Sequence, residues 1–343
     1  MARILYGVMG DAGGHINRSL AVAAELPEHD FLFVGGGKVE EALSRGHDYE
    51  PLPMLSTVLK DSKVLMAETA LHFGKTITGY GKIIDGLCGT IDSFKPDLAI
   101  TDYEFFLPRA ARKYGLECVS LDHQHVLTHC DYPTPPGERL SRFFTVASAR
   151  RLFSRVDKFL VSSFYALPPK DDSTEVFPPI MHRDIEDFTS SEKDHVVVYM
   201  RSGVSPSLLE GMRFSNRDFQ VYGLGAQSAQ GNLQFLPSSR EGFLENLASA
   251  AYVICNGGHT LTCEALHLGK PVLAFPTSFF YEQYFNAVYL EKLGYGRMGM
   301  EDCRESIVRF EQALEQCRAR LAGIDLFGNG QVAERINRLL ASG

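Results

Sequence analysis

The sequence has few basic residues for its length. Its 34 lysines and arginines are outnumbered by 42 aspartates and glutamates, so the formal net charge is −8. Proteins that bind nucleic acid neutralise its phosphates with a broad basic face. The charge balance therefore argues against a nucleic-acid partner, although it is compatible with local basic patches.

The sequence also lacks long apolar runs and paired cysteines. No stretch approaches the ~18 consecutive apolar residues of a membrane span, and the first residues lead directly into an expected strand, without the apolar region and cleavage site of a signal peptide. The seven cysteines are an odd number and include no C-x2-C pair. This pattern favours reduced thiols and offers no zinc site. We therefore expect a cytoplasmic protein that needs neither a metal nor a cofactor.

The chain instead shows a repeated alternation of short apolar runs with helical segments. The first run, 3–8, is followed by a glycine-rich turn and by an amphipathic helix that stops at Pro27. Strands that alternate with helices predict parallel sheets. The turn does not have the G-x-G-x-x-G spacing of a dinucleotide site, which argues against a dehydrogenase.

The length and the pattern predict an α/β protein with two domains. A chain of 343 residues can bury two cores, and charged and small polar residues interrupt the apolar rhythm at 181–194. We expect an N-terminal domain at 1–183, a C-terminal domain at 184–324, and a final helical segment at 325–343.

The most specific pattern lies at 255–296. An apolar strand leads into Gly257 and Gly258, which allow a tight turn and a close approach to a ligand. The helix that follows presents free N–H groups and the positive end of its dipole, and both favour a phosphate. His259 is a further donor there. Glu264 lies one turn deeper, where its carboxylate can accept from two ribose hydroxyls.

The order GG-x-T-x3-EA-x3-G-x-P, then P-x5-EQ-x2-NA-x2-L-x3-G, resembles the donor-binding region of GT-B glycosyltransferases. The resemblance is closest to the UDP-glucuronosyl and peptidoglycan N-acetylglucosaminyltransferase groups. It implies two Rossmann-like parallel-sheet domains that face a central cleft, with the final segment crossing back to the first domain.

The resemblance also implies roles for individual residues in binding the nucleotide sugar. Glu264 would bind the ribose, Glu282 and Gln283 the sugar hydroxyls, and the main chain of Phe235 and Leu236 a uracil. The diphosphate would be bound by main-chain amides, those of Gly258, His259 and Thr260. Arg201 and Ser202 follow another strand, and because a guanidinium suits phosphate we expect them to face the same diphosphate.

His15 is the candidate general base. It follows Gly14, which we assign to the nucleotide-sugar site, at the carboxyl end of the first strand, where open α/β sheets bind ligands. A neutral imidazole there can take a proton from an acceptor hydroxyl, and the GT-B resemblance assigns it that role. The alternative is a helix-capping histidine without catalytic function.

Polar clusters follow two further strands and should reach the same edge of the sheet. Asp102 and Glu104 follow one strand, and His123 and His125 follow the next. A carboxylate beside His15 would orient the ring and stabilise its protonated form, and we choose Asp102 for this role. The other three are expected on the acceptor side. Their alternative is a solvated loop with local turn hydrogen bonds.

Together these features predict an inverting, metal-independent transferase that moves a sugar from a UDP-sugar to a hydroxyl group of a glycan, lipid or small-molecule acceptor. The order G-G-H-I-N-R-S also resembles the GH-x2-R turn of nucleotide-sugar hydrolases with the same fold. A hydrolase or an epimerase is therefore one alternative. A nucleotide-sugar-binding regulator without turnover is another.

The segment 139–158 combines five arginines with several apolar side chains. Such a segment can rest on an anionic membrane or hold a lipid-linked acceptor, which would place the protein at the inner face of the membrane. The alternative is a surface helix whose apolar side packs inward.

Overall fold

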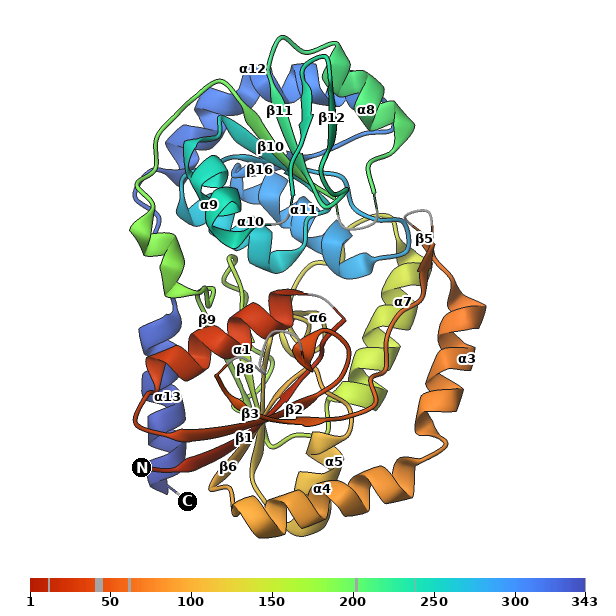
Figure 1. Cartoon of the computed structure of the whole chain (residues 1–343), viewed down its shortest axis with the longest axis vertical. Helices are drawn as coiled ribbons and strands as arrows, with labels where there is room; N and C mark the ends of the chain where they lie inside the picture. The colour runs from red at the N-terminus through yellow and green to blue at the C-terminus, as the bar shows by residue number, and fades with distance from the viewer. Residues whose placement is uncertain (12, 41–45, 61–62, 201–202, 238, 343) are drawn as a thin grey trace.

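The computed structural model describes residues 1–11, 13–40, 46–60, 63–200, 203–237 and 239–342, and within them two seven-stranded sheets form two lobes (Figure 1). The first sheet is parallel throughout. Its order is β3 (Asp48–Pro51), β2 (Asp30–Gly35), β1 (Arg3–Val8), β6 (Leu98–Asp102), β7 (Cys118–Asp122), β8 (Lys158–Ser162) and β9 (Thr174–Phe177).

The second sheet is parallel except at one edge, where β12 pairs antiparallel with β13. Its order is β12 (Gln227–Gln230), β13 (Leu233–Phe235), β11 (Phe219–Tyr222), β10 (Val196–Tyr199), β14 (Tyr252–Cys255), β15 (Val272–Ala274) and β16 (Gly296–Met298). The short strands β4 (Leu59–Lys60) and β5 (Lys63–Val64) pair antiparallel. The expectation of two α/β domains with parallel sheets is confirmed.

Helices cover the faces of both sheets. Those of the first lobe are α1 (Gly13–Glu25), α3 (Met66–Ile77), α4 (Tyr80–Phe94), α5 (Leu107–Tyr114), α6 (Val126–His129) and α7 (Arg139–Ser148), which a π-helical turn extends over Ala149–Phe153. Those that follow are a 3-10 turn (Arg183–Asp187), α8 (Pro206–Arg213), α9 (Arg240–Ser249), α10 (His259–His267), α11 (Tyr281–Leu293), α12 (Cys303–Leu321) and α13 (Asn329–Ser342). All five residues of β6 are buried, as is usual for a parallel strand covered on both faces.

The chain returns to the first lobe at its end. In Figure 1 α13, in blue, lies beside α1 and β1, in red, and both termini are at the same end of the molecule. Val332, Ile336 and Leu339 on one side of α13 share a buried cluster with Ile4 and Tyr6 of β1. Burial of this apolar stripe fixes the last helix to the first lobe.

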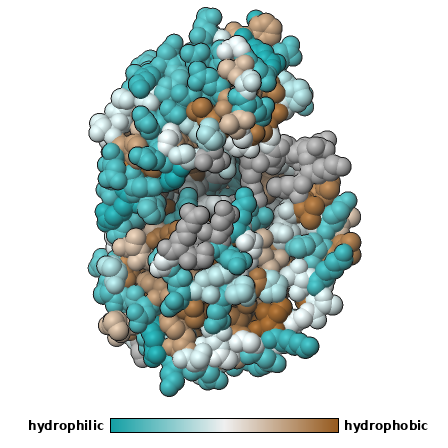
Figure 2. All heavy atoms as spheres, in the orientation of Figure 1, coloured by the Kyte–Doolittle hydropathy of each residue, from teal (hydrophilic) through white to brown (hydrophobic). Residues whose placement is uncertain are grey.

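The two lobes meet where the carboxyl ends of their strands face each other. The start of α1 lies against the start of α10, so closely that a Cβ atom added to Gly14 would lie 2.6 Å from Oγ1 of Thr260. The surface is hollowed between the lobes (Figure 2). Across the described ranges, no helix is both long and apolar enough to cross a bilayer.

Candidate active site

A buried cluster of three side chains lies at the carboxyl end of β1 and β6. Nδ1 of His15, in the first turn of α1, is 2.6 Å from Oδ1 of Asp102, the last residue of β6. Arg18 lies one turn further along α1 and holds the same carboxylate with two contacts, Nε to Oδ2 at 2.8 Å and Nη2 to Oδ1 at 2.7 Å. Asp102 is fully buried, so its charge needs the guanidinium of Arg18 as a counter-charge, and the His15 ring adds a hydrogen bond to the same carboxylate.

These contacts define the tautomer of His15. A carboxylate only accepts hydrogen bonds, so the proton of the neutral ring is on Nδ1 and the lone pair is on Nε2. Nε2 lies 3.4 Å from the side-chain nitrogen of Gln124, which can donate to it. A histidine held in this way can accept a proton from a group that enters the cleft, while Asp102 stabilises the positive charge that forms on the ring.

Gln124 links this cluster to the second lobe. Its Nε2 donates to Oε2 of Glu282, in the first turn of α11, at 3.1 Å. Its Oε1 is buried and has no hydrogen-bond partner among the described residues. A hydroxyl of a bound molecule could donate to this oxygen, so Gln124 lies between the candidate base and the carboxylate expected to bind the sugar.

His123, expected on the acceptor side, lies at the junction of the lobes, and its acceptor-side role stays a prediction. It is fully buried; Nδ1 donates to the carbonyl of Ser162 at 2.9 Å, and Nε2 lies 2.9 Å from Oδ1 of Asn286 in α11. Its ring stacks on that of His259 with centroids 3.8 Å apart. Burial lowers the pKa of His123 and lowers that of His259 well below its usual range. Burial therefore opposes a positive charge on either ring.

His125 and Glu104 make their contacts within the first lobe. His125 is buried, with Nδ1 2.6 Å from Oδ2 of Asp122. The Glu104 carboxylate accepts the N–H groups of Phe106 and Leu107 at the start of α5. Burial raises the pKa of Glu104, and these N–H donors oppose that shift. The structure thus gives both residues supporting contacts, and their expected acceptor-side role stays a prediction.

The start of α10 has the geometry expected of an anion site. Gly257 has a φ of 79°, a backbone conformation that glycine adopts readily, and Gly258 caps the helix without a side chain. The N–H groups of the first turn, at His259 and Thr260, lie opposite the start of α1. Two helix N-termini with their positive dipole ends therefore converge near Gly14, which favours negative charge between them.

Glu264 is buried on α10 and is paired with a cation. Its Oε1 lies 2.8 Å from Nη1 of Arg240, the first residue of α9, and Arg240 also contacts both carboxylate oxygens of Asp184 at 2.9 Å. Burial raises the pKa of Glu264, and Arg240 opposes the shift. A ribose that binds Glu264 would thus find its carboxylate already held in place by Arg240.

The structure places the other residues predicted to bind the nucleotide sugar as follows. Gln283 is buried and its Oε1 accepts the N–H of Thr277 at 2.8 Å, so it fixes the loop before α11. Phe235 is buried at the end of β13, and the N–H of Leu236 donates to the carbonyl of Val221. Arg201 and Ser202 lie outside the described residues.

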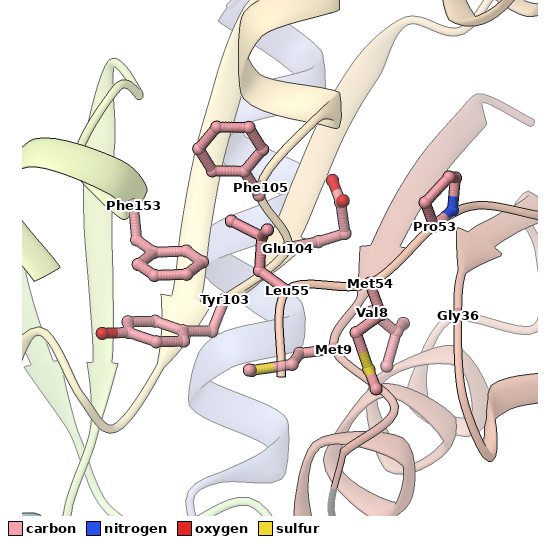
Figure 3. Close-up of a pocket in the computed structure, with 10 residues that line it drawn as sticks. All are labelled: Val8, Met9, Gly36, Pro53, Met54, Leu55, Tyr103, Glu104, Phe105 and Phe153. Atoms are coloured by element: carbon pink, nitrogen blue, oxygen red, sulfur yellow. The ribbon is translucent and has the colours of Figure 1, made fainter. Parts of the chain in front are cut away.

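A mostly apolar pocket lies in the first lobe, beside the cluster formed by His15, Arg18 and Asp102 (Figure 3). It is lined by Val8, Met9, Gly36, Pro53, Met54, Leu55, Tyr103, Glu104, Phe105 and Phe153. Tyr103 follows Asp102 with a φ of 57°, a conformation that a bulky side chain rarely adopts. Its ring stacks on Phe153 at 3.9 Å and lies 6.3 Å from the ring of His15. The strained backbone directs this aromatic ring between the pocket and the candidate base.

Three residues of the site were not among the sequence candidates. Arg18 belongs to the GH-x2-R order quoted above, Gln124 lies between His123 and His125, and Arg240 is the first residue of α9. For Arg18 and Gln124, the only signal in the sequence was their position next to candidate residues. Within the part of the chain that the structure describes, no group of three or more histidine, cysteine, aspartate or glutamate side chains is placed to hold a metal ion.

Comparisons with known proteins agree with this architecture. The sequence model described as glycosyl transferase family 1 matches residues 2–315. Two uncharacterized glycosyltransferases of Methanosarcina acetivorans and Methanosarcina mazei are 25% and 22% identical to the chain, with 86% of this chain and 85% of theirs covered.

Solved structures of the same architecture cover nearly the whole chain. A UDP-glucosyltransferase from Polygonum tinctorium, capable of glucosylating indoxyl, superposes with a TM-score of 0.70 at 14% identity, over 100% of this chain and 99% of its own. The glycotransferase of kitacinnamycin gives 0.67 at 16% identity, over 98% and 99%. At these identities the likeness shows the fold, which is GT-B.

Proposed function

The chain belongs to glycosyl transferase family 1, and we propose that it transfers a sugar from a UDP-sugar to a hydroxyl acceptor, with inversion and with His15 as the general base. The contact between His15 and Asp102 carries this proposal, because it leaves a lone pair on Nε2, the ring nitrogen that faces Gln124 at the junction of the lobes. That the chain is a glycosyltransferase follows from its family; the donor, the stereochemistry and the base are the proposal.

In the proposed reaction the acceptor hydroxyl takes the place of the Gln124 amide at Nε2 of His15. The ring accepts the hydroxyl proton while the oxygen attacks the anomeric carbon, and the bond from this carbon to the diphosphate breaks. A single displacement of this kind inverts the anomeric configuration. Asp102 stabilises the imidazolium as it forms.

The start of α10 would bind the leaving diphosphate. Its free N–H groups and those of the opposing α1 are fixed before the reaction, so they can stabilise the charge that develops on the diphosphate without a metal. Glu264 would bind the ribose, and Glu282 the sugar. The similar fold of a protein named as a UDP-glucosyltransferase supports UDP as the nucleotide.

The acceptor would enter from the first lobe, through the apolar pocket beside Tyr103. The neighbouring α7 carries three exposed apolar side chains, with Leu140 58% exposed, Phe143 64% and Phe144 42%. Exposed arginines accompany them, at 139, 150, 151 and 155. We name the face formed by these seven residues the α7 face. Its composition supports a peripheral contact with an anionic membrane.

A nucleotide-sugar hydrolase is the second candidate function. The same His15 could activate a water molecule in place of an acceptor hydroxyl, and the GH-x2-R order is present from Gly14 to Arg18. Only the acceptor requirement distinguishes the two reactions.

The first test is a panel of UDP-, dTDP-, GDP- and CMP-sugars, each incubated without acceptor and then with a lipid and glycan extract, with excess chelator in parallel. Mass spectrometry follows the free nucleotide. Release of UDP that requires the extract and resists the chelator is the expected result, and release without extract would favour the hydrolase. Intact donor in every arm would overturn the proposal.

Two variants test the assigned roles. His15→Ala should abolish transfer while UDP affinity stays nearly unchanged, because the ring acts on the acceptor proton. Glu264→Ala should weaken UDP binding, and unchanged affinity would remove its ribose role. The product anomer, read from its proton coupling constant, reports whether the configuration inverts.

A further inference from the structure

The side chain of Arg18 contacts both members of the proposed catalytic pair. It is 3% exposed, its Nε and Nη2 hold the two oxygens of Asp102, and its Nη2 lies 3.2 Å from Nδ1 of His15. Since Nδ1 carries a proton in the neutral ring, this last pair consists of two donors and is a close approach of like groups, not a hydrogen bond.

We propose that Arg18 is a positioning residue that sets the basicity of His15 by neutralising the carboxylate they share. This inference rests on the proposed function, because basicity matters only if His15 accepts the acceptor proton. It extends that function by assigning a role to the arginine of the GH-x2-R order.

The charges around Asp102 explain this role. With Arg18 present, the carboxylate and the guanidinium cancel, so protonation of His15 leaves one net positive charge in a buried cluster. Without Arg18, protonation of His15 would cancel an unpaired buried carboxylate and would be strongly favoured. Arg18 therefore keeps the imidazole deprotonated, and available as a base, to lower pH.

The choice of arginine fits this role. Its planar fork matches both oxygens of Asp102 at once, and it fixes the orientation of the carboxylate relative to the imidazole. Burial alone would lower the pKa of Arg18, but attraction to Asp102 outweighs it and holds the pKa above its usual value. The guanidinium is thus a permanent charge over the working pH range.

Among the described residues, other charged and titratable groups around the cluster come from four further elements and from Tyr103, the residue after Asp102. The Tyr103 ring lies 6.3 Å from that of His15, and burial raises its pKa well above the usual value, so it stays neutral. Tyr6 comes from β1, Asp122 from β7, His259 from α10 and Glu282 from α11, the last through Gln124. Tyr6 is buried, which raises its pKa and keeps it neutral. These groups are the same in every variant below, so differences between variants report on Arg18.

The test compares Arg18→Met with the wild-type chain by two measurements. The first is the pH dependence of kcat/KM for transfer. The acid limb should move to higher pH in the variant by about one to three pH units, the usual effect of one charge at this range. The second is a nuclear magnetic resonance titration of the His15 ring with histidine labelled in the imidazole, in which the midpoint should move in the same direction.

Asp102→Asn is the matched control, because it removes the other charge. It keeps Arg18 beside the ring and should move the midpoint to lower pH, opposite to Arg18→Met. Arg18→Lys retains the charge without the fork and should give a smaller shift than Arg18→Met, so it also serves if the methionine variant does not fold. If Arg18 had only a structural role, its replacement would lower the rate of transfer but would leave the acid limb of the pH profile and the midpoint of the His15 titration unchanged.

The outcomes separate this inference from the proposed function. A midpoint that is unchanged or falls in Arg18→Met overturns the inference, whatever the activity. A midpoint that rises supports the charge relationship, even if no donor is turned over, in which case it is the proposed transfer that fails. If the midpoint of the His15 titration and the acid limb of the pH profile both move to higher pH, the inference and the proposed function are supported together.

Discussion

The side-chain nitrogen of Gln124 donates to Oε2 of Glu282 at 3.1 Å and thereby joins the loop after β7 to α11 of the other lobe. The same nitrogen lies 3.4 Å from Nε2 of His15. The candidate base and the candidate sugar-binding carboxylate are therefore connected through one amide. Any acceptor or sugar hydroxyl that reaches either group must replace or share this contact.

Gln124→Ala should lower kcat/KM by about tenfold to a hundredfold, the cost of one or two lost hydrogen bonds to charged or buried groups. Gln124→Glu should lower it further, because a second carboxylate would face Glu282 at close range. Steady-state kinetics with the donor found in the panel measures both. Gln234→Ala, at an exposed position on β13, is the control and should be neutral. Equal activity of the Gln124 and Gln234 variants would exclude a role for Gln124.

Gly14→Ala should impair closure of the lobes, since the new Cβ would lie 2.6 Å from Oγ1 of Thr260. We expect at least a tenfold loss of kcat/KM, with the melting temperature of the protein changed little. Thr260→Ala removes the clashing oxygen and leaves Cβ of residue 260 at an ordinary 3.5 Å. The double variant should therefore be more active than Gly14→Ala alone. If it is not, the clash is not the cause of the loss.

The free energy of unfolding should fall as the pH drops from about 6.5 toward 4. Burial lowers the pKa of His129 to about 4 from its ordinary 6.5, and burial also lowers that of His123 and His267. The folded state therefore binds fewer protons than the unfolded state, so stability is fully present above pH 6.5 and is lost below it. His129→Gln should reduce this loss by about 1–2 kcal/mol, measured by urea unfolding at pH 7 and pH 4.5. Parallel pH dependences for variant and wild type would contradict the assignment.

The α7 face should bind anionic vesicles. Replacing both Phe143 and Phe144 by serine should weaken binding to vesicles with 30 mol% anionic lipid by about tenfold or more, from the loss of apolar burial. Phe214→Ser is the matched control, because Phe214 is 56% exposed on the other lobe. Co-sedimentation at low and high salt gives the readout. Failure of the wild-type chain to sediment would end the proposal of membrane contact.

Several features of the fold could be predicted from local sequence. The apolar runs followed by glycine or polar turns predicted parallel sheets, and the helix after Gly258 begins where its pattern indicated, with His259 as the first helical residue. The final helical segment was also expected, and it is present as α13. Such features depend on neighbours within a few residues, so a single sequence carries them.

Only part of the candidate site could be predicted from local sequence. His15 and Asp102 could be chosen because the carboxyl ends of neighbouring parallel strands share an edge, but Arg18 could not be assigned to the same carboxylate. His123 was expected on an acceptor face, whereas its Nε2 lies against Asn286 across the junction of the lobes. Nothing in the sequence around Glu264 indicated that it pairs with Arg240, because Arg240 comes from another helix.

The sequence by itself thus determined the family, the two α/β domains and the residues that follow each strand, because these are recorded in local patterns and in a specific motif. Only the tertiary structure decided which of those residues meet. The contacts between Gln124 and Glu282 and between His123 and Asn286 join positions 158 and 163 residues apart. Their geometry depends on how two separately built sheets pack against each other, and no pattern along the chain encodes that packing at the level of single side chains.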